Sequence, residues 1–129
     1  MRLAFLFALA GVSGVRAGEN AIERTVASGR PAQVAAYHSW DPVDCKSLAA
    51  KLTVLTKPSH GTLIPSLVPH VITTSRLGAP GSCYGKPITA LQLSYKSAPG
   101  YHGPDSFTID VTFGFENRKD RDAYSITVQ

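Results

Sequence analysis

The segment that decides the fold class is SFTIDVTFGF, residues 106–115. Every second position holds a large apolar side chain, and the positions between hold serine, threonine, aspartate or glycine. The apolar residues are Phe107, Ile109, Val111, Phe113 and Phe115. A helix would scatter these side chains around its circumference, whereas successive residues of a strand point to opposite faces. The segment therefore predicts a β-strand with one buried face.

The end of the chain repeats this alternation, with Tyr124, Ile126 and Val128 on one face. The charged run ENRKDRD at 116–122 lies between the two segments and predicts a hairpin loop. Upstream, short apolar or β-branched runs are separated by proline and glycine, which predicts further strands. These strands are expected at residues 32–39, 48–56, 62–64, 70–74 and 88–95. About seven short strands with turns between them favour an antiparallel β-sandwich.

Two regions of this sandwich are expected to be marginal. Pro65 and Pro69 interrupt the stretch between residues 62 and 74, so it is at best an edge strand. Residues 18–30 are polar and mixed, which predicts a frayed N-terminal arm, with one edge strand as the alternative, ahead of a domain at 31–129. The predicted core face consists of Leu52, Val54, Leu91, Leu93, Tyr95, Phe107, Ile109, Val111, Phe113, Tyr124, Ile126 and Val128.

The first residues have the pattern of a secretory signal peptide. Arg2 is followed by an almost uninterrupted apolar run, and Val15-Arg16-Ala17 resembles a cleavage site, so residues 1–17 are expected to be removed. The apolar run is well short of the roughly 20 residues that a membrane-spanning helix needs. We therefore expect an exported chain, periplasmic or extracellular, with no transmembrane segment after cleavage.

The two cysteines agree with export. Cys45 and Cys83 are the only ones in the chain, and an even number in a small exported domain indicates a disulfide. The alternative is a redox or metal-binding pair, but no C-x-x-C spacing is present to lower a thiol pKa. A structural disulfide between Cys45 and Cys83 is the prediction.

Two blocks of sequence resemble a known family. The first is KPSHGTL at 57–63, and the second is LSYKSAPGYHGPDSFT at 93–108. Together with the two final strands they resemble the bacterial Ig-like, cadherin-like repeat domains of surface and exported proteins, over about residues 50–129. The resemblance implies an Ig-like sandwich. The family occurs in tandem arrays, whereas this chain holds a single copy with no calcium-binding run of carboxylates, so a stalk function does not carry over.

The second block has a structural interpretation. Pro99 and Gly100 suit a turn whose second central residue needs a positive φ. Tyr101 stands where such sandwiches often place a corner tyrosine, whose hydroxyl bonds to nearby backbone. Gly103 permits a close approach of the chain, and Asp105 is expected to accept backbone N–H bonds. Phe107 then begins the buried face, so none of these positions is predicted to be catalytic.

Composition excludes several functions. The formal charge of the whole chain is +4, and removing Arg2 and Arg16 leaves 11 basic against 9 acidic residues, too few for a nucleic-acid-binding face. The hydrophobic content of 43% is enough for a packed core. No G-x-S-x-G or H-E-x-x-H motif is present, so an enzyme is not expected, and no cofactor is predicted.

A binding module is the favoured class, because loops at the ends of a sandwich commonly carry recognition. The first candidate surface is Arg118, Lys119 and Arg121 in the predicted hairpin loop, which suits an acidic protein or glycan of the cell envelope. The second is Tyr84, beside Cys83 in the loop 77–87. The ligand itself is not identified by the sequence, and a monomer is expected.

Two alternatives remain open. The chain has four histidines, His38, His60, His70 and His102, which could form a copper or zinc site in space, although no H-x-H or H-x₃-H spacing exists. The outcome expected for them is that no metal is bound. The other alternative is an assembly subunit, in which residues 18–30 would add a strand to the sheet edge of a neighbouring copy.

Overall fold

The computed structural model describes residues 19–73 and 81–129, so the predicted signal peptide and residues 74–80 lie outside the described part. The described residues form seven strands and one short 3₁₀ turn, η1 (Gly81–Cys83). The strands are β1 (Glu19–Val26), β2 (Ala32–Tyr37), β3 (Lys51–Thr56), β4 (Gly61–Val71), β5 (Pro87–Ser97), β6 (Gly103–Thr112) and β7 (Lys119–Val128).

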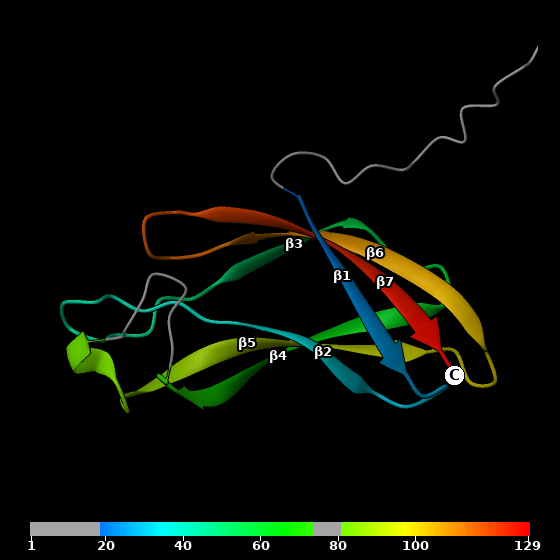
Figure 1. The fold of residues 1–129 in the computed structure, drawn as a ribbon, viewed down its shortest axis with the longest axis horizontal. Helices are drawn as coiled ribbons and strands as arrows, with labels where there is room; N and C mark the ends of the chain where they lie inside the picture. The colour runs from blue at the N-terminus through cyan, green and yellow to red at the C-terminus, as the bar shows by residue number, and fades with distance from the viewer. Residues whose placement is uncertain (1–18, 74–80) are drawn as a thin grey trace, which may run out of the picture.

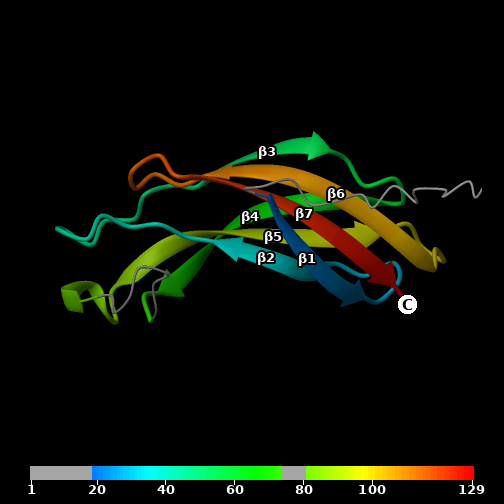
Figure 2. The same cartoon turned by 45° about the horizontal axis from the view of Figure 1, so that its top comes forward.

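The strands form two packed sheets, which Figures 1 and 2 show as the two layers of a sandwich. One sheet has the order β1-β7-β6-β3 and the other β2-β5-β4. All pairs are antiparallel except β1 with β7. This arrangement separates β2, β5 and β4 from β3, β6 and β7 as in an Ig-like sandwich. The predicted fold class is confirmed.

The core lies between the sheets and follows the predicted alternation closely. Nine of the twelve predicted core residues are buried, and Leu52 and Leu91 are partly buried against them. Val54 is the exception at 37% exposed, because β3 is an edge strand whose pairing with β6 shifts between Val54 and Thr56. The core also contains six buried residues that were not predicted from the sequence: Val26, Val34, Tyr37, Ile72, Ile88 and Ala90.

Residues 19–26 form a full strand at a sheet edge, so the frayed arm is corrected and the alternative of an edge strand is confirmed. Strand β1 pairs with β7 along its whole length, from Glu19 opposite Arg121 to Val26 opposite Val128. Backbone pairing and two side chains hold it in place. The Asn20 amide donates to Asp122 at 2.8 Å, and the Arg24 guanidinium donates to the Val34 carbonyl of β2 at 3.0 Å.

The stretch with two prolines is one continuous strand, β4, at the edge of the three-stranded sheet. Alternate residues of β4 direct their N–H groups toward β5 and away from it. Pro65 and Pro69 are four residues apart, so both occupy positions whose N–H would face away from β5, and no bond to β5 is lost. An edge strand tolerates this, and the two prolines leave fewer donors for a further strand to pair with. The expected position at a sheet edge is confirmed, while the expected break is not.

Gly61, the first residue of β4, is required by packing. A side-chain carbon there would lie 2.5 Å from the ring of Tyr95, which is fully buried. Since Tyr95 cannot move outward, we expect Gly61→Ala to lower the free energy of unfolding by about 2 kcal/mol. Urea denaturation measures this. The exposed neighbour change Thr62→Ala should cost no more than about 0.5 kcal/mol, and equal stability of both variants would contradict the packing argument.

Candidate functional site

Three turns meet at the end of the sandwich where the chain ends (right in Figure 1). They are residues 27–31, 57–60 and 98–102, and we call this region the basic end. The Ala98 amide donates to the His60 carbonyl at 2.8 Å, which joins the second turn to the third. A carbon placed on Gly29 would lie 3.4 Å from the Cα atom of Pro99, so the first turn also lies against the third.

Asp105 holds this end together from inside. Its carboxylate accepts backbone N–H bonds from Ser59 and Ser106 at 2.9 Å and from His60 at 3.1 Å. It also accepts the hydroxyl of Tyr95 at 2.7 Å. Burial raises the pKa of Asp105, but these bonds outweigh burial and hold it below its usual range. Desolvation, and then the contact with Asp105, raise the pKa of the Tyr95 hydroxyl.

Tyr101 fixes the outer layer of the same end. Its hydroxyl donates to the carbonyl of Pro104, and its ring stacks on that of His60 with centroids 4.0 Å apart. The preceding turn is closed by the Tyr101 amide, which donates to the Ala98 carbonyl at 3.1 Å, and Gly100 has a φ of 79°. Gly103 has a φ of 136° and lies beside the Tyr101 hydroxyl. The block that carries the family resemblance thus shapes this end.

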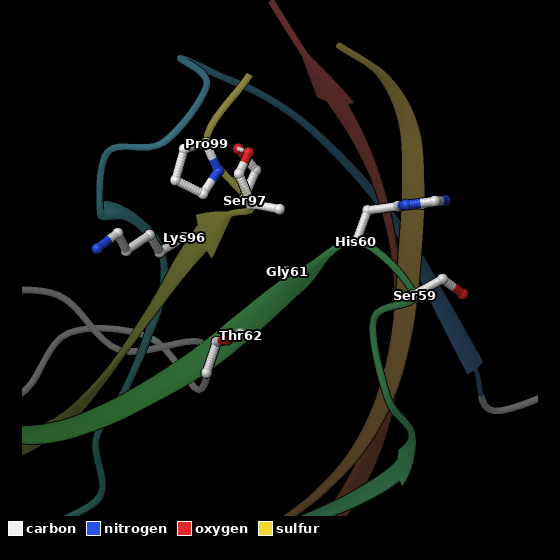
Figure 3. Close-up of a pocket in the computed structure, with 8 residues that line it drawn as sticks. Ser59, His60, Gly61, Thr62, Lys96, Ser97 and Pro99 are labelled. Atoms are coloured by element: carbon white, nitrogen blue, oxygen red, sulfur yellow. Dashed lines mark hydrogen bonds between the residues drawn. The ribbon is translucent and has the colours of Figure 1, made fainter. Parts of the chain in front are cut away.

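A shallow groove of about 440 Å³ opens between the turns (Figure 3). Figure 3 shows Thr62, Lys96 and Pro99 along one side, with Ser59 and His60 directed away from Lys96. The lining residues are Ser59, His60, Gly61, Thr62, Lys96, Ser97, Ala98 and Pro99. The groove is therefore open, with the Thr62 hydroxyl and the Lys96 ammonium group at its edge and the imidazole of His60 stacked on Tyr101.

The charge of this end is one-sided. The three turns contain Arg30 and Lys57 and no acidic residue. Lys96 lies at the end of β5, two residues before the third turn. Within the described part of the chain, none of these three cations forms an ion pair. Asp105 is the nearby carboxylate, and its four bonds are directed into the fold. The side chains of the three turns therefore carry more basic than acidic groups.

The bounds of the predicted loop with Arg118, Lys119 and Arg121 require correction, while a role of these residues in binding stays a prediction. Strand β7 begins at Lys119, so only Arg118 lies in the turn. The Arg121 guanidinium makes two hydrogen bonds to the Asp110 carboxylate, at 2.8 and 3.1 Å. Arg118 lies over the Phe113 ring and contacts Asp120 at 3.3 Å. Two of the three cations are thus engaged within the hairpin.

The turn of this hairpin is shorter than predicted, because residues 119–122 belong to β7 and the acidic Asp122 lies on the buried face of that strand. Asp122 is only 3% exposed and accepts the Tyr37 hydroxyl at 2.6 Å. Tyr37 also bonds to the hydroxyl of Tyr124, which links β2 to β7 across the core. Desolvation, and then the bonds to Asp122 and Tyr124, raise the pKa of Tyr37. This buried network explains why a charged residue stands at a core position.

The histidines lie in two separate places. His38 and His70 have ring centroids 4.4 Å apart, with Trp40 stacked on His38, whereas His60 lies in the basic end against Tyr101. His102 directly follows Tyr101. Among residues 19–73 and 81–129, no group of three or more histidine, cysteine or acidic side chains could hold a metal ion. The geometry described thus gives no support to the copper or zinc alternative.

The predicted disulfide is confirmed, with the Cα atoms of Cys45 and Cys83 5.4 Å apart. Tyr84, the second predicted binding residue, is 66% exposed beside it. Strand β1 occupies the edge of its own sheet, so residues 19–26 already have the pairing that the assembly alternative assigned to a neighbour. No helix in the described ranges is long and apolar enough to cross a membrane.

No family model matches this sequence, and no curated protein matches it either. Both turn blocks stand out in the sequence, but the groove between them does not, because nothing in the sequence shows that residues 57–60 and 98–102 are in contact. The available signal was one basic residue in each block, Lys57 at the start of the first and Lys96 inside the second.

Proposed function

We propose that the protein is an exported, non-enzymatic binding module whose basic end holds an acidic glycan of the cell envelope. One observation carries this proposal: a 440 Å³ groove with Thr62 and Lys96 among its lining residues opens between turns that contain Arg30 and Lys57 and no acidic residue. The hydroxyl of Thr62, which lies opposite Lys96 in the sheet, suits a sugar hydroxyl. Lysines 57 and 96, together with Arg30, suit carboxylate or sulfate groups.

The openness of the groove favours an extended polymer over an enclosed small molecule, since sites for small ligands bury most of the ligand surface. Hydrolysis of the glycan is not part of the proposal. Glycosidases of the common type use two carboxyl groups that flank the scissile bond. Asp105 faces inward, and four hydrogen bonds occupy its oxygens, which suits a structural anchor.

Export and envelope association rest on three supports. Residues 1–17 have the pattern of a signal peptide. The disulfide between Cys45 and Cys83 suits an oxidising compartment. The resemblance of residues 57–63 and 93–108 to bacterial Ig-like, cadherin-like repeats supports a surface or periplasmic role for a single copy of such a domain.

The test is calorimetric titration of the protein without residues 1–17, using chondroitin sulfate and polygalacturonate as acidic probes and dextran as a neutral one. We expect an acidic probe to bind and the Lys57→Ala/Lys96→Ala variant to bind it about tenfold more weakly, because two exposed ionic contacts are each worth up to about 1 kcal/mol. Raising the salt concentration should weaken binding, since screening acts on exposed charges.

The matched control is Lys46→Ala/Lys86→Ala, which removes the same charge at the opposite end of the sandwich. Binding by this control should change less than about twofold, since its lysines lie beyond the screening length of roughly 10 Å from the groove. If both variants lost the same binding affinity, the effect would come from the net charge of the protein, and a site at the basic end would be contradicted. Equal binding of dextran would contradict acidic specificity.

A further inference from the structure

The other end of the sandwich, which carries the disulfide, exposes apolar side chains instead of a cluster of cations. Figures 1 and 2 both place the loop after β2 next to η1 at this end. Val43 in that loop is 89% exposed, and Tyr84, directly after η1, is 66% exposed. The Cys45–Cys83 bond joins the two segments, with Cα atoms 5.4 Å apart. We call these two apolar side chains the tip.

The exposure of the tip is built into well-bonded backbone. The Val43 amide donates to the Asp41 carboxylate at 2.8 Å, and the Cys45 amide donates to the Asp41 carbonyl, also at 2.8 Å. The Tyr84 amide donates to the Gly81 carbonyl at 3.3 Å. Beneath the loops, Cys83 and Ile72 are fully buried. The disulfide and this small core therefore hold both apolar side chains in water.

These features suit a lipid surface. In hydrocarbon a chain must satisfy its own backbone polar groups, and the amides of Val43 and Tyr84 already have partners within their own loops. Tyrosine favours the boundary between headgroups and acyl chains, because its ring is apolar and its hydroxyl polar. A partner protein would need a pocket for each of two separate projections, whereas a fluid membrane admits both.

The charges beside the tip indicate which headgroup. Lys46, with a side chain 80% exposed, follows Val43 by three residues and lies 4.0 Å from the carboxylate of Asp44. Lys86 is exposed and follows Tyr84 by two residues. Both signs are thus present beside the tip, and the stems of the two lysines are long enough to extend toward phosphate. A mixed rim matches a headgroup that itself carries both signs.

We propose that Val43 and Tyr84 insert into the interface of a membrane made of zwitterionic phospholipid. Binding is weak and reversible, since two apolar side chains bury far less surface than a lipid anchor or a helix. The protein would then present its basic end away from the membrane, toward the envelope space. This inference does not depend on the glycan: the two surfaces lie at opposite ends of the sandwich and involve different residues.

Co-sedimentation with phosphatidylcholine vesicles tests the proposal, using the disulfide-bonded protein without residues 1–17. We expect measurable partition in millimolar lipid. Val43→Asp should lower the partition coefficient about tenfold, because it deletes the apolar contact and adds a charge, and Tyr84→Ser should lower it about fivefold. Both side chains are exposed, so thermal midpoints should stay near that of the native protein.

The matched control is Leu55→Asp, which makes the same kind of change at an exposed apolar residue of β3 and should leave partition unchanged. The Lys57→Ala/Lys96→Ala variant should also partition normally, which separates this result from glycan binding. Failure to bind phosphatidylcholine, or equal loss in Leu55→Asp, would overturn the proposal. Binding only to phosphatidylglycerol vesicles, or self-association lost in Val43→Asp, would assign the surface to another ligand or a second copy.

Discussion

Replacing Asp105 by asparagine is expected to lower the free energy of unfolding by about 4 kcal/mol, a loss typical of breaking a buried, hydrogen-bonded charge site. Asp105 is 8% exposed as a residue, and its carboxylate accepts four hydrogen bonds, from Ser59, His60, Ser106 and Tyr95. An asparagine has one acceptor oxygen, and its NH₂ group would face donors. If the oxygen keeps the Ser59 and Ser106 N–H groups, the NH₂ group would face the other two donors. The His60 N–H would then lose its acceptor, and the Tyr95 hydroxyl could no longer donate at this position.

The same residue predicts a pH dependence with a definite sign. The pKa of Asp105 is lower in the folded protein than its usual value of about 3.9. Its stabilising contribution is therefore fully present above the unfolded pKa and is lost as the pH falls through the folded value. The difference in stability between the native protein and Asp105→Asn should be constant from pH 7 to 5 and shrink below about pH 4.

Urea denaturation at pH 7, 5 and 3 measures both effects. Tyr95→Phe is the control, because it removes one of the four bonds and leaves three, and should cost about 1.5 kcal/mol at pH 7. A stability difference that persists unchanged to pH 3 would contradict the role assigned to the carboxylate. A loss in Asp105→Asn no larger than that in Tyr95→Phe would show that the three backbone bonds contribute little.

The sequence was most informative where one face of a strand is buried and the other is solvated. In β6 and β7 the alternation of large apolar and small polar residues has the same period as the backbone, so strand type and buried face could be read directly. Val54 shows the limit. It belongs to an apolar run, but exposure depends on whether a neighbouring strand covers it, and β3 is at an edge with a register shift.

Elements held by backbone pairing and polar contacts were harder to predict. Strand β1 has a mostly polar sequence and still forms, because backbone pairing with β7 and the side-chain bonds of Asn20 and Arg24 hold it in place. Asp122 is charged in the sequence but buried in the fold, because Tyr37, distant in sequence, supplies its partner. Contacts of this kind leave no periodic signal, and the groove of the basic end depends on them as well.

Removing the disulfide, by the change Cys45→Ala/Cys83→Ala, is expected to lower the free energy of unfolding by about 4 kcal/mol in the chain-entropy description. The bond closes a loop with a sequence separation of 38. Its loss frees the loop in the unfolded chain and removes the link between the two segments of the tip. Cys83 also belongs to the small core with Ile72 and Ile88, so packing there should loosen.

The fluorescence of Trp40 monitors the disulfide end of the sandwich, because Trp40 packs against the small core there and is the only tryptophan in the chain. In the native protein, its fluorescence and the far-ultraviolet circular dichroism should change together as urea is added. In the variant, the fluorescence should change at lower urea, because the disulfide end can open before the two sheets separate. A variant within about 1 kcal/mol of the native protein would contradict the stabilising role of the bond.

A second variant separates the cross-link from the backbone conformation. Cys45 has a φ of 61°, a left-handed conformation that costs a non-glycine residue about 1 kcal/mol. Cys45→Gly/Cys83→Ala should therefore be more stable than Cys45→Ala/Cys83→Ala by about that amount, provided that the loop keeps its shape without the bond. Equal stability of the two variants would mean that the loop relaxes once the bond is removed. The disulfide would then be what holds Val43 in its exposed position, and vesicle binding should fall in both variants.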